Sequence, residues 1–269
     1  MKNIKRIWCY FLIIFLLPIQ SYCQKNINYT NIEVSYNFQR NNYESDYILM
    51  FDGNIALWEE TSDLMPRKNA NINFERVVPY MRKNVYFDIN SSTILSNLEI
   101  IYQKFYIREK KSNLNWKLSD STETILGYKC SMATTNFRGR EYIVFYTDNI
   151  LTNIGPWKLH GLPGLILKVE SHSYDELYKI EATDLKINKE KSKNYLSTYK
   201  KFEKKYKRKF QSWGEFEKDI NKYINNLINY NKSNFEEDID DDDGGKSGFR
   251  LMNYLEIFHP SQMNTIWYD

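Results

Sequence analysis

Cysteine and histidine are both scarce in this chain of 269 residues, which contains three of each. Two of the cysteines, Cys9 and Cys23, lie within the first 23 residues, and the third is Cys130. If the N-terminal segment is removed, no disulfide can form within the mature chain, so its stability must come from packing. No histidine has a histidine or cysteine two to four residues away, which excludes the common zinc-binding spacings. We therefore expect neither a metal site nor another cofactor.

Long apolar runs are also absent, except at residues 7–19. Basic residues precede this run: Lys2, Lys5 and Arg6. The run is shorter than the roughly 20 residues that span a membrane, and a small residue, Ser21, lies two positions before Cys23. This pattern predicts a signal peptide cleaved after Cys23 and a periplasmic or secreted protein. A signal anchor is the alternative. Gln20 and Tyr22 do not fit the sequence that directs lipid attachment to a cysteine, which argues against a lipoprotein.

Motifs that carry chemistry are missing as well. The chain has no Gly-x-Ser-x-Gly and no glycine-rich loop suited to phosphate. Cys130 lies in an alternating run at residues 127–132, which predicts a buried strand position. The acidic run at residues 236–243 lacks the spacing of a calcium-binding loop, because no start places a glycine at position 6 and a glutamate at position 12. We do not predict an enzyme, although carboxylates on separate strands could still meet as a glycosidase pair.

The abundant residues are aromatic, with 22 Tyr, 15 Phe and 6 Trp, and such side chains favour strands. Residues 32–38 alternate cleanly between apolar and polar, and an Asp-Gly at residues 52–53 predicts a hairpin. A second hairpin loop is predicted at residues 136–140, around Gly139. We therefore predict a mainly β fold, an open barrel or curved antiparallel sheet, followed by C-terminal amphipathic helices.

Aromatic residues recur every three or four positions after residue 188 and predict one face of an amphipathic helix. They are Tyr195, Tyr199, Phe202, Tyr206, Phe210 and Trp213. Ser212 and Glu215 then have the spacing of a capping box that begins a second helix. Residues 186–209 contain eleven basic residues against two acids, although the net charge of the chain is only +3. This basic face is either simply solvated or contacts an acidic partner or headgroup.

The predicted organisation has five parts. A signal peptide at residues 1–23 precedes a β-rich domain at 24–188. A helical segment at 189–232 packs on that domain. An acidic mobile loop follows at 233–248, because it is too polar and too charged to pack. The final segment at 249–269 is apolar enough to dock back on the body.

The run Gly161-Leu162-Pro163-Gly164-Leu165-Ile166 predicts a turn that leads into a buried strand, with Gly164 at the positive φ of a type II turn. This run resembles the name-giving motif of the GLPGLI family of exported proteins. Further family-like blocks occur in the usual order and include Trp116-Lys117-Leu118, Gly127, Gly139, Gly155 and Pro156. Two positions depart from the pattern. Phe145 stands where the family tends to have Trp, and Tyr254 stands where it often has Pro.

This resemblance implies an exported protein without an assigned activity, of a kind often found beside outer-membrane receptor systems. A similar module is related to the N-terminal domain of some bacterial peptide N-glycanases, which implies a β-rich, bowl-like fold. We therefore expect a non-enzymatic binding or accessory module of the cell envelope that partners an outer-membrane receptor. The alternative is a glycan- or glycopeptide-directed hydrolase. Export argues against a nucleic-acid partner.

Four residues are the candidate ligand-binding set. Trp157 and His160 lie in the loop before the motif and could stack on a ligand or hydrogen-bond to it, while Arg138 and Arg140 at the hairpin tip could add charge. An aromatic concave sheet could then hold an apolar or glycan ligand. The competing interpretation places Trp157 in the core and makes His160 an ordinary exposed residue.

Overall fold

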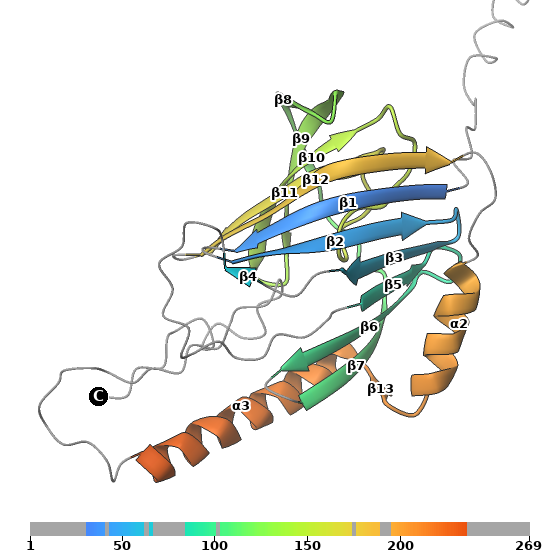
Figure 1. The fold of residues 1–269 in the computed structure, drawn as a ribbon. Helices are drawn as coiled ribbons and strands as arrows, with labels where there is room; N and C mark the ends of the chain where they lie inside the picture. The colour runs from blue at the N-terminus through green and yellow to red at the C-terminus, as the bar shows by residue number, and fades with distance from the viewer. Residues whose placement is uncertain are drawn as a thin grey trace, which may run out of the picture.

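The computed structural model describes residues 31–40, 43–61, 65–66, 84–100, 103–173, 176–188 and 195–235. Within these described residues, thirteen strands form one sheet; one helix follows the twelfth strand, and a second helix follows the thirteenth (Figure 1). The strands are β1 (Asn31–Arg40), β2 (Tyr43–Phe51), β3 (Ile55–Glu60), β4 (Met65–Pro66), β5 (Asn84–Asp88), β6 (Thr93–Ile100), β7 (Gln103–Lys110), β8 (Lys117–Ile125), β9 (Tyr128–Phe137), β10 (Arg140–Thr147), β11 (Leu165–Ser173), β12 (Glu176–Asn188) and β13 (Phe210–Gln211). The helices are α2 (Tyr195–Tyr206) and α3 (Trp213–Phe235). The predicted signal peptide at 1–23, the predicted C-terminal segment at 249–269 and residues 236–248 of the predicted acidic loop lie outside the described residues. The first three residues of that predicted loop, 233–235, instead belong to α3, so the helix extends beyond the predicted end at 232.

The strand order is β13-β7-β6-β5-β3-β2-β1-β12-β11-β10-β9-β8, with the short β4 beside β2. Neighbouring strands of the described sheet run antiparallel, except that β13 runs parallel to β7. The sheet is strongly curved and does not close on itself, as Figure 1 shows. This confirms the predicted curved antiparallel sheet. None of the helices that the structure describes is long and apolar enough to cross a membrane.

Tight turns connect the hairpins where the sequence predicts them. Gly53, between β2 and β3, has φ of 89°. At the β9–β10 turn both Arg138 and Gly139 have positive φ, the conformation of a type I′ hairpin turn. This turn has only two residues, so the strands extend further than predicted. Arg140 is therefore the first residue of β10 and not part of a loop.

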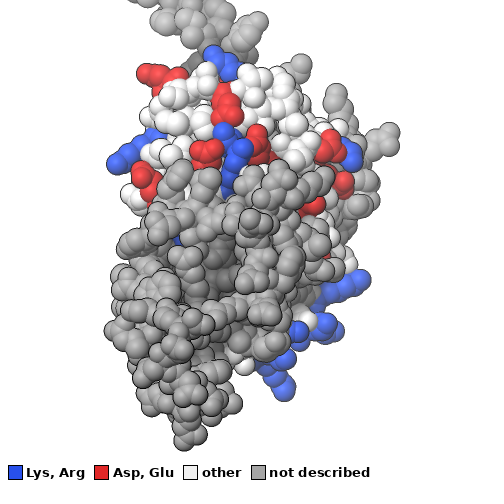
Figure 2. Space-filling model, turned by 60° about the vertical axis from the view of Figure 1, so that its left-hand side comes forward, with Lys and Arg blue, Asp and Glu red and all other residues white. Residues whose placement is uncertain are grey.

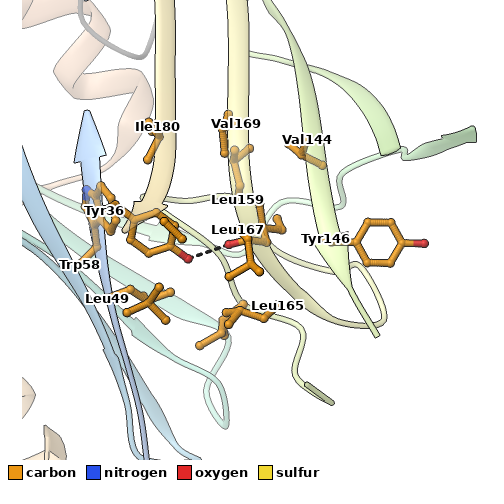
Figure 3. Packing of buried hydrophobic residues seen from close by; sticks show 14 of the residues in the cluster. Tyr36, Leu49, Trp58, Val144, Tyr146, Leu159, Leu165, Leu167, Val169 and Ile180 are labelled. Carbon is orange, nitrogen blue, oxygen red and sulfur yellow. Dashed lines mark hydrogen bonds between the residues drawn. The ribbon is translucent and has the colours of Figure 1, made fainter. Parts of the chain in front are cut away.

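The core lies on the concave face of the sheet, which we call the inner face. Figure 3 shows Tyr36, Trp58, Val144, Val169 and Ile180 converging there from five strands. Because the pleat of a strand points successive side chains to opposite faces, the side chains on this face are buried while their neighbours in sequence stay more accessible, as in β9 and β10. The hydroxyl of Tyr36 donates a 2.6 Å hydrogen bond to the backbone oxygen of Ile166, which ties β1 to β11. The thiol of Cys130 is buried in the same core, as predicted.

The motif at residues 161–166 brings the preceding loop against the sheet. Leu159 and Leu162 are buried in the core. The predicted positive φ of Gly164 is wrong: Gly161 has it instead, at 95°. Gly164 is needed for space, since a Cβ there would lie 2.1 Å from the backbone oxygen of Thr147. This close approach of two backbones is what a side chain would prevent.

The two helices cover opposite faces of the sheet. Tyr195 and Tyr199 of α2 pack in a cluster with Leu95 of β6, and α3 packs in another with Leu98 of the same strand. Residues three apart on a strand point to opposite sides, so α2 lies on the outer face and α3 on the inner face. Between them the chain passes around the β7 edge of the sheet, where β13 pairs with β7.

The predicted first helix is too long. The observed helix α2 ends at Tyr206, and Phe210 pairs with Tyr106 as part of β13 instead of continuing the helical face. The predicted capping box is confirmed at the start of α3. The backbone N–H of Ser212 donates to Glu215 Oε2 at 2.7 Å, and the backbone N–H of Glu215 donates to Ser212 Oγ at 3.3 Å. Exchange of these two bonds satisfies donors that a helix N-terminus leaves open.

Candidate functional site

One of the four candidate residues, Arg138, makes contacts across the opening of the curved sheet, and Trp157 and His160 lie in the loop beside it. Arg138 at the β9–β10 turn and Lys158 in the following loop both form ion pairs with Glu109 of β7. The Lys158–Glu109 distance is 2.5 Å. Glu109 and Arg138 belong to opposite ends of the strand order, so these contacts join the two sides of the open sheet. The guanidinium of Arg138 also lies 3.2 Å from the ring centre of Trp213, the first residue of α3.

We call Glu109, Arg138, Lys158 and Trp213 the clasp. Its charged side chains are largely buried, with exposed fractions of 7% for Glu109, 12% for Arg138 and 3% for Lys158. Burial raises the pKa of the Glu109 carboxyl, but the positive charges of Lys158 and Arg138 outweigh burial and hold that pKa below its ordinary value. The carboxylate is thus committed to two cations. This arrangement suits a structural tie and leaves Glu109 poorly placed as a general acid.

The side chain of His160 is buried and engaged by backbone groups. Its Nδ1 lies 2.7 Å from the Lys158 oxygen and its Nε2 lies 2.9 Å from the Ser112 oxygen. Its ring packs against Phe87 at 5.2 Å between ring centres. Burial lowers the pKa of His160 below its ordinary value, although both carbonyl contacts oppose this effect. His160 is therefore not the exposed residue of the competing interpretation, because both ring nitrogens face backbone carbonyl oxygens, to one of which the neutral ring donates.

Trp157 is half-buried and belongs to the same region. Its ring lies 5.6 Å from Phe137 and 6.0 Å from Tyr142, measured between ring centres. Its φ of 56° is unusual for a residue with a large side chain and reflects the tight turn after Pro156. The indole N–H of Trp116 donates to the His160 oxygen at 2.9 Å. Trp157, His160 and Arg138 thus link the loop to the strands around it.

The fourth candidate, Arg140, is separated from the others. It lies on the inner face at the start of β10 and is 2% exposed. Its guanidinium carbon lies 4.4 Å above the centre of the Tyr178 ring. None of its Nε, Nη1 and Nη2 atoms has a hydrogen-bond partner. Sequence inspection placed both arginines at one hairpin tip, whereas the structure gives Arg138 an internal counterion and leaves Arg140 with a ring alone.

An aromatic series continues from Tyr178 across the inner face. Neighbouring rings are 4.7 to 5.9 Å apart in the order Tyr178, Phe38, Tyr47 and Trp58. These residues come from β12, β1, β2 and β3. Ser45 lies opposite Phe38 in the β1–β2 pair and is buried, and its hydroxyl has no hydrogen-bond partner. Sequence reasoning missed Ser45, since a serine in an alternating strand carries no signal.

A surface rich in positive charge lies at the C-terminal end of α2 and in the turn after it. We call it the basic surface, and it comprises Lys200, Lys201, Lys204, Lys205, Lys207, Arg208 and Lys209, all exposed. Figure 2 shows a group of lysine and arginine side chains at the lower right of the visible face, without acidic side chains among them. The acid within this stretch, Glu203, is paired with Arg108 of β7 at 2.9 Å. The basic surface therefore keeps a strong excess of positive charge.

No metal-binding group was found within the described part of the chain: it contains no cluster of three or more His, Cys, Asp or Glu side chains able to hold an ion. The sequence model of a family described as "N-glycanase peptide, N-terminal domain" matches residues 30–209, more than half of the chain. The chain belongs to this family. The predicted relation to the N-terminal domain of peptide N-glycanases is thereby confirmed.

Two solved structures of PNGF-II are similar to this chain. One, in space group C2, is 18% identical, with a TM-score of 0.41, and the match covers 63% of this chain and 29% of the other. The second, in space group P21, is 19% identical, with a TM-score of 0.43 and coverage of 62% and 30%. The chain thus matches less than a third of the length of these proteins. No curated protein matches the chain.

Proposed function

We propose that this protein is an exported, non-enzymatic binding or accessory module of the cell envelope, which docks an acidic surface of an outer-membrane receptor protein. The observation that carries the proposal is the basic surface. Seven exposed cations lie within ten residues, at positions fixed by the packing of α2 on the sheet. Such a concentration of one charge accelerates and orients the encounter with an acidic partner.

The family match supports a module of this kind. The family is defined as an N-terminal domain, and the chain matches only a minor part of the solved PNGF-II chains. In the part of the chain that the structure describes, the predicted binding residues Arg138, Trp157 and His160 are engaged in internal contacts. Membership of the GLPGLI family and the cleaved signal peptide stay predictions, and the periplasmic or secreted location rests on the latter.

The test is co-purification of residues 24–269 from the native envelope, followed by mass spectrometry of the retained proteins. The charge-neutralised variant replaces five residues by glutamine: Lys204, Lys205, Lys207, Arg208 and Lys209. A matched control replaces five exposed lysines elsewhere: Lys110, Lys117, Lys129, Lys186 and Lys218. We expect a recurrent outer-membrane receptor that the first variant loses, the control retains, and raised salt releases. Equal recovery with both variants would contradict the proposal.

The rival function is hydrolysis of glycans or glycopeptides, which the family description favours. It is tested by incubating the mature protein with an N-glycosylated peptide and analysing the products by mass spectrometry. Release of the glycan at a rate proportional to protein concentration would establish the rival function. An unchanged glycopeptide, with receptor recovery as above, would support the accessory role.

A further inference from the structure

Arg140 is a cation that the fold buries without a counterion. Its side chain is 2% exposed, its three nitrogens have no hydrogen-bond partner, and it forms no ion pair with any described acid. The neighbouring acid in sequence, Glu141, is exposed and points to the other face. Glu170 of the adjacent strand pairs with Lys168 at 3.1 Å. Of the described acids next to Arg140 on β10 and on the adjacent β11, Glu141 therefore points away from it and Glu170 is already paired.

The contact with Tyr178 compensates this burial only in part. A guanidinium stays charged at any physiological pH and offers five N–H donors in a planar fork. Stacking on an aromatic ring offsets some of the lost hydration, but it satisfies none of those donors. Buried polar groups in folded proteins are as a rule hydrogen-bonded, so a fully unpartnered arginine indicates a missing partner. The planar fork matches two oxygen atoms of one anionic group.

The surroundings of Arg140 define the rest of the partner. The ring of Tyr178 lies against the guanidinium and the ring of Phe38 packs beside Tyr178; both rings are buried in the core of the inner face, and neither carries charge. Ser45, opposite Phe38, adds a buried hydroxyl without a hydrogen-bond partner. A ligand that fits these groups carries an oxyanion for Arg140, a ring or carbon face for the aromatic side chains, and a polar atom for Ser45.

We propose that Arg140 anchors a binding site on the inner face for an organic oxyanion, such as an acidic sugar. The anionic group is a carboxylate or a phosphate or sulfate ester, all of which share the bidentate chemistry. This site lies on the inner face and is separate from the basic surface of the proposed function, which is on and beside α2. Loss of the receptor-docking proposal would therefore leave this proposal unaffected, and the reverse also holds.

The test uses four sugars that differ in one group: glucuronate, glucose 6-phosphate, glucose 6-sulfate and neutral glucose. Binding to the mature protein is measured by titration calorimetry and by the midpoint of thermal unfolding. We expect at least one anionic sugar to bind and raise the midpoint, and glucose not to do so. At a ligand concentration of 100 times Kd, the unfolding equilibrium constant should fall about 100-fold. The sugar that binds identifies whether the anionic group is a carboxylate, phosphate or sulfate.

Two arginine variants make the test specific. Arg140→Met should weaken binding at least tenfold and raise the unfolding midpoint of the ligand-free protein, because it removes an uncompensated buried charge. A merely structural arginine would give the opposite stability change. The matched control is Arg108→Met, which removes a half-exposed arginine paired with Glu203 and should leave binding unchanged.

Three results would overturn the proposal. One is that no anionic sugar binds the wild-type protein, or that glucose stabilises it equally. Another is that Arg140→Met binds the anionic sugar as tightly as the wild type does. The third is that Arg140→Met lowers the unfolding midpoint of the ligand-free protein or fails to fold, since the guanidinium would then be needed by the fold itself.

Discussion

Glu109→Gln removes the carboxylate charge on which the clasp depends, while it keeps the size and shape of the side chain. Both cations, Arg138 and Lys158, then stay largely buried and lose their ion pairs with Glu109. Removing one partner of a buried ion pair costs about 3–5 kcal/mol, and we expect the lower end because glutamine still accepts hydrogen bonds. The free energy of unfolding should therefore fall by about 3 kcal/mol.

The assay is urea unfolding followed by tryptophan fluorescence, which reports on the clasp through Trp213. The matched control is Glu203→Gln, because Glu203 forms its ion pair with Arg108 at a half-exposed position. Such pairs contribute less than about 1 kcal/mol. If both variants lose the same small amount of stability, the clasp does not hold the two sides of the sheet together, and our reasoning is refuted.

The pH dependence of the free energy of unfolding checks independently that the charged Glu109 stabilises the fold. The pKa of Glu109 is lowered in the folded protein from its ordinary value of 4.5, so the unfolded chain binds the proton first as pH falls. The stabilising contribution is complete above the unfolded pKa and is lost as pH falls through the folded pKa. The stability difference between wild type and Glu109→Gln should therefore narrow below pH 4.5. A difference that widens on acidification would contradict the assignment.

Three further predictions concern the packing of the fold. Gly164→Ala should lower the free energy of unfolding by about 3 kcal/mol, because the added Cβ meets backbone. Gly214→Ala should raise the free energy of unfolding by up to about 1 kcal/mol, because the space around its Cβ is open. Urea titrations of both variants test this pair. The Cys130 thiol should react with a thiol reagent only after unfolding, since burial raises its pKa to about 11, and rapid labelling of the folded protein would argue against its burial. Ser212→Ala should cost about 1 kcal/mol through loss of the α3 cap, measured as a lower urea midpoint.

The candidate site shows most clearly where sequence reasoning stops. Arg138 and Arg140 are two residues apart in a Phe-Arg-Gly-Arg run, and nothing in that run distinguishes them. Arg138 meets Glu109 only because the sheet curves until β7 faces the β9–β10 turn. Arg140 is directed inward by the pleat of β10 toward Tyr178, a residue 38 positions away in the chain. The same long-range geometry buries His160 against Ser112.

Local sequence patterns predicted the structure correctly where that structure depends on residues close together in the chain. Alternation predicted the strands, glycine in tight turns predicted the hairpins, and the Ser212–Glu215 spacing predicted the α3 cap, because each depends on neighbours a few residues away. The helical spacing of aromatics failed at Phe210, where pairing with β7 outweighed the helical pattern. Tertiary structure alone decided which charges pair, which glycine needs space and which arginine lacks a partner, since these depend on groups that only folding brings together.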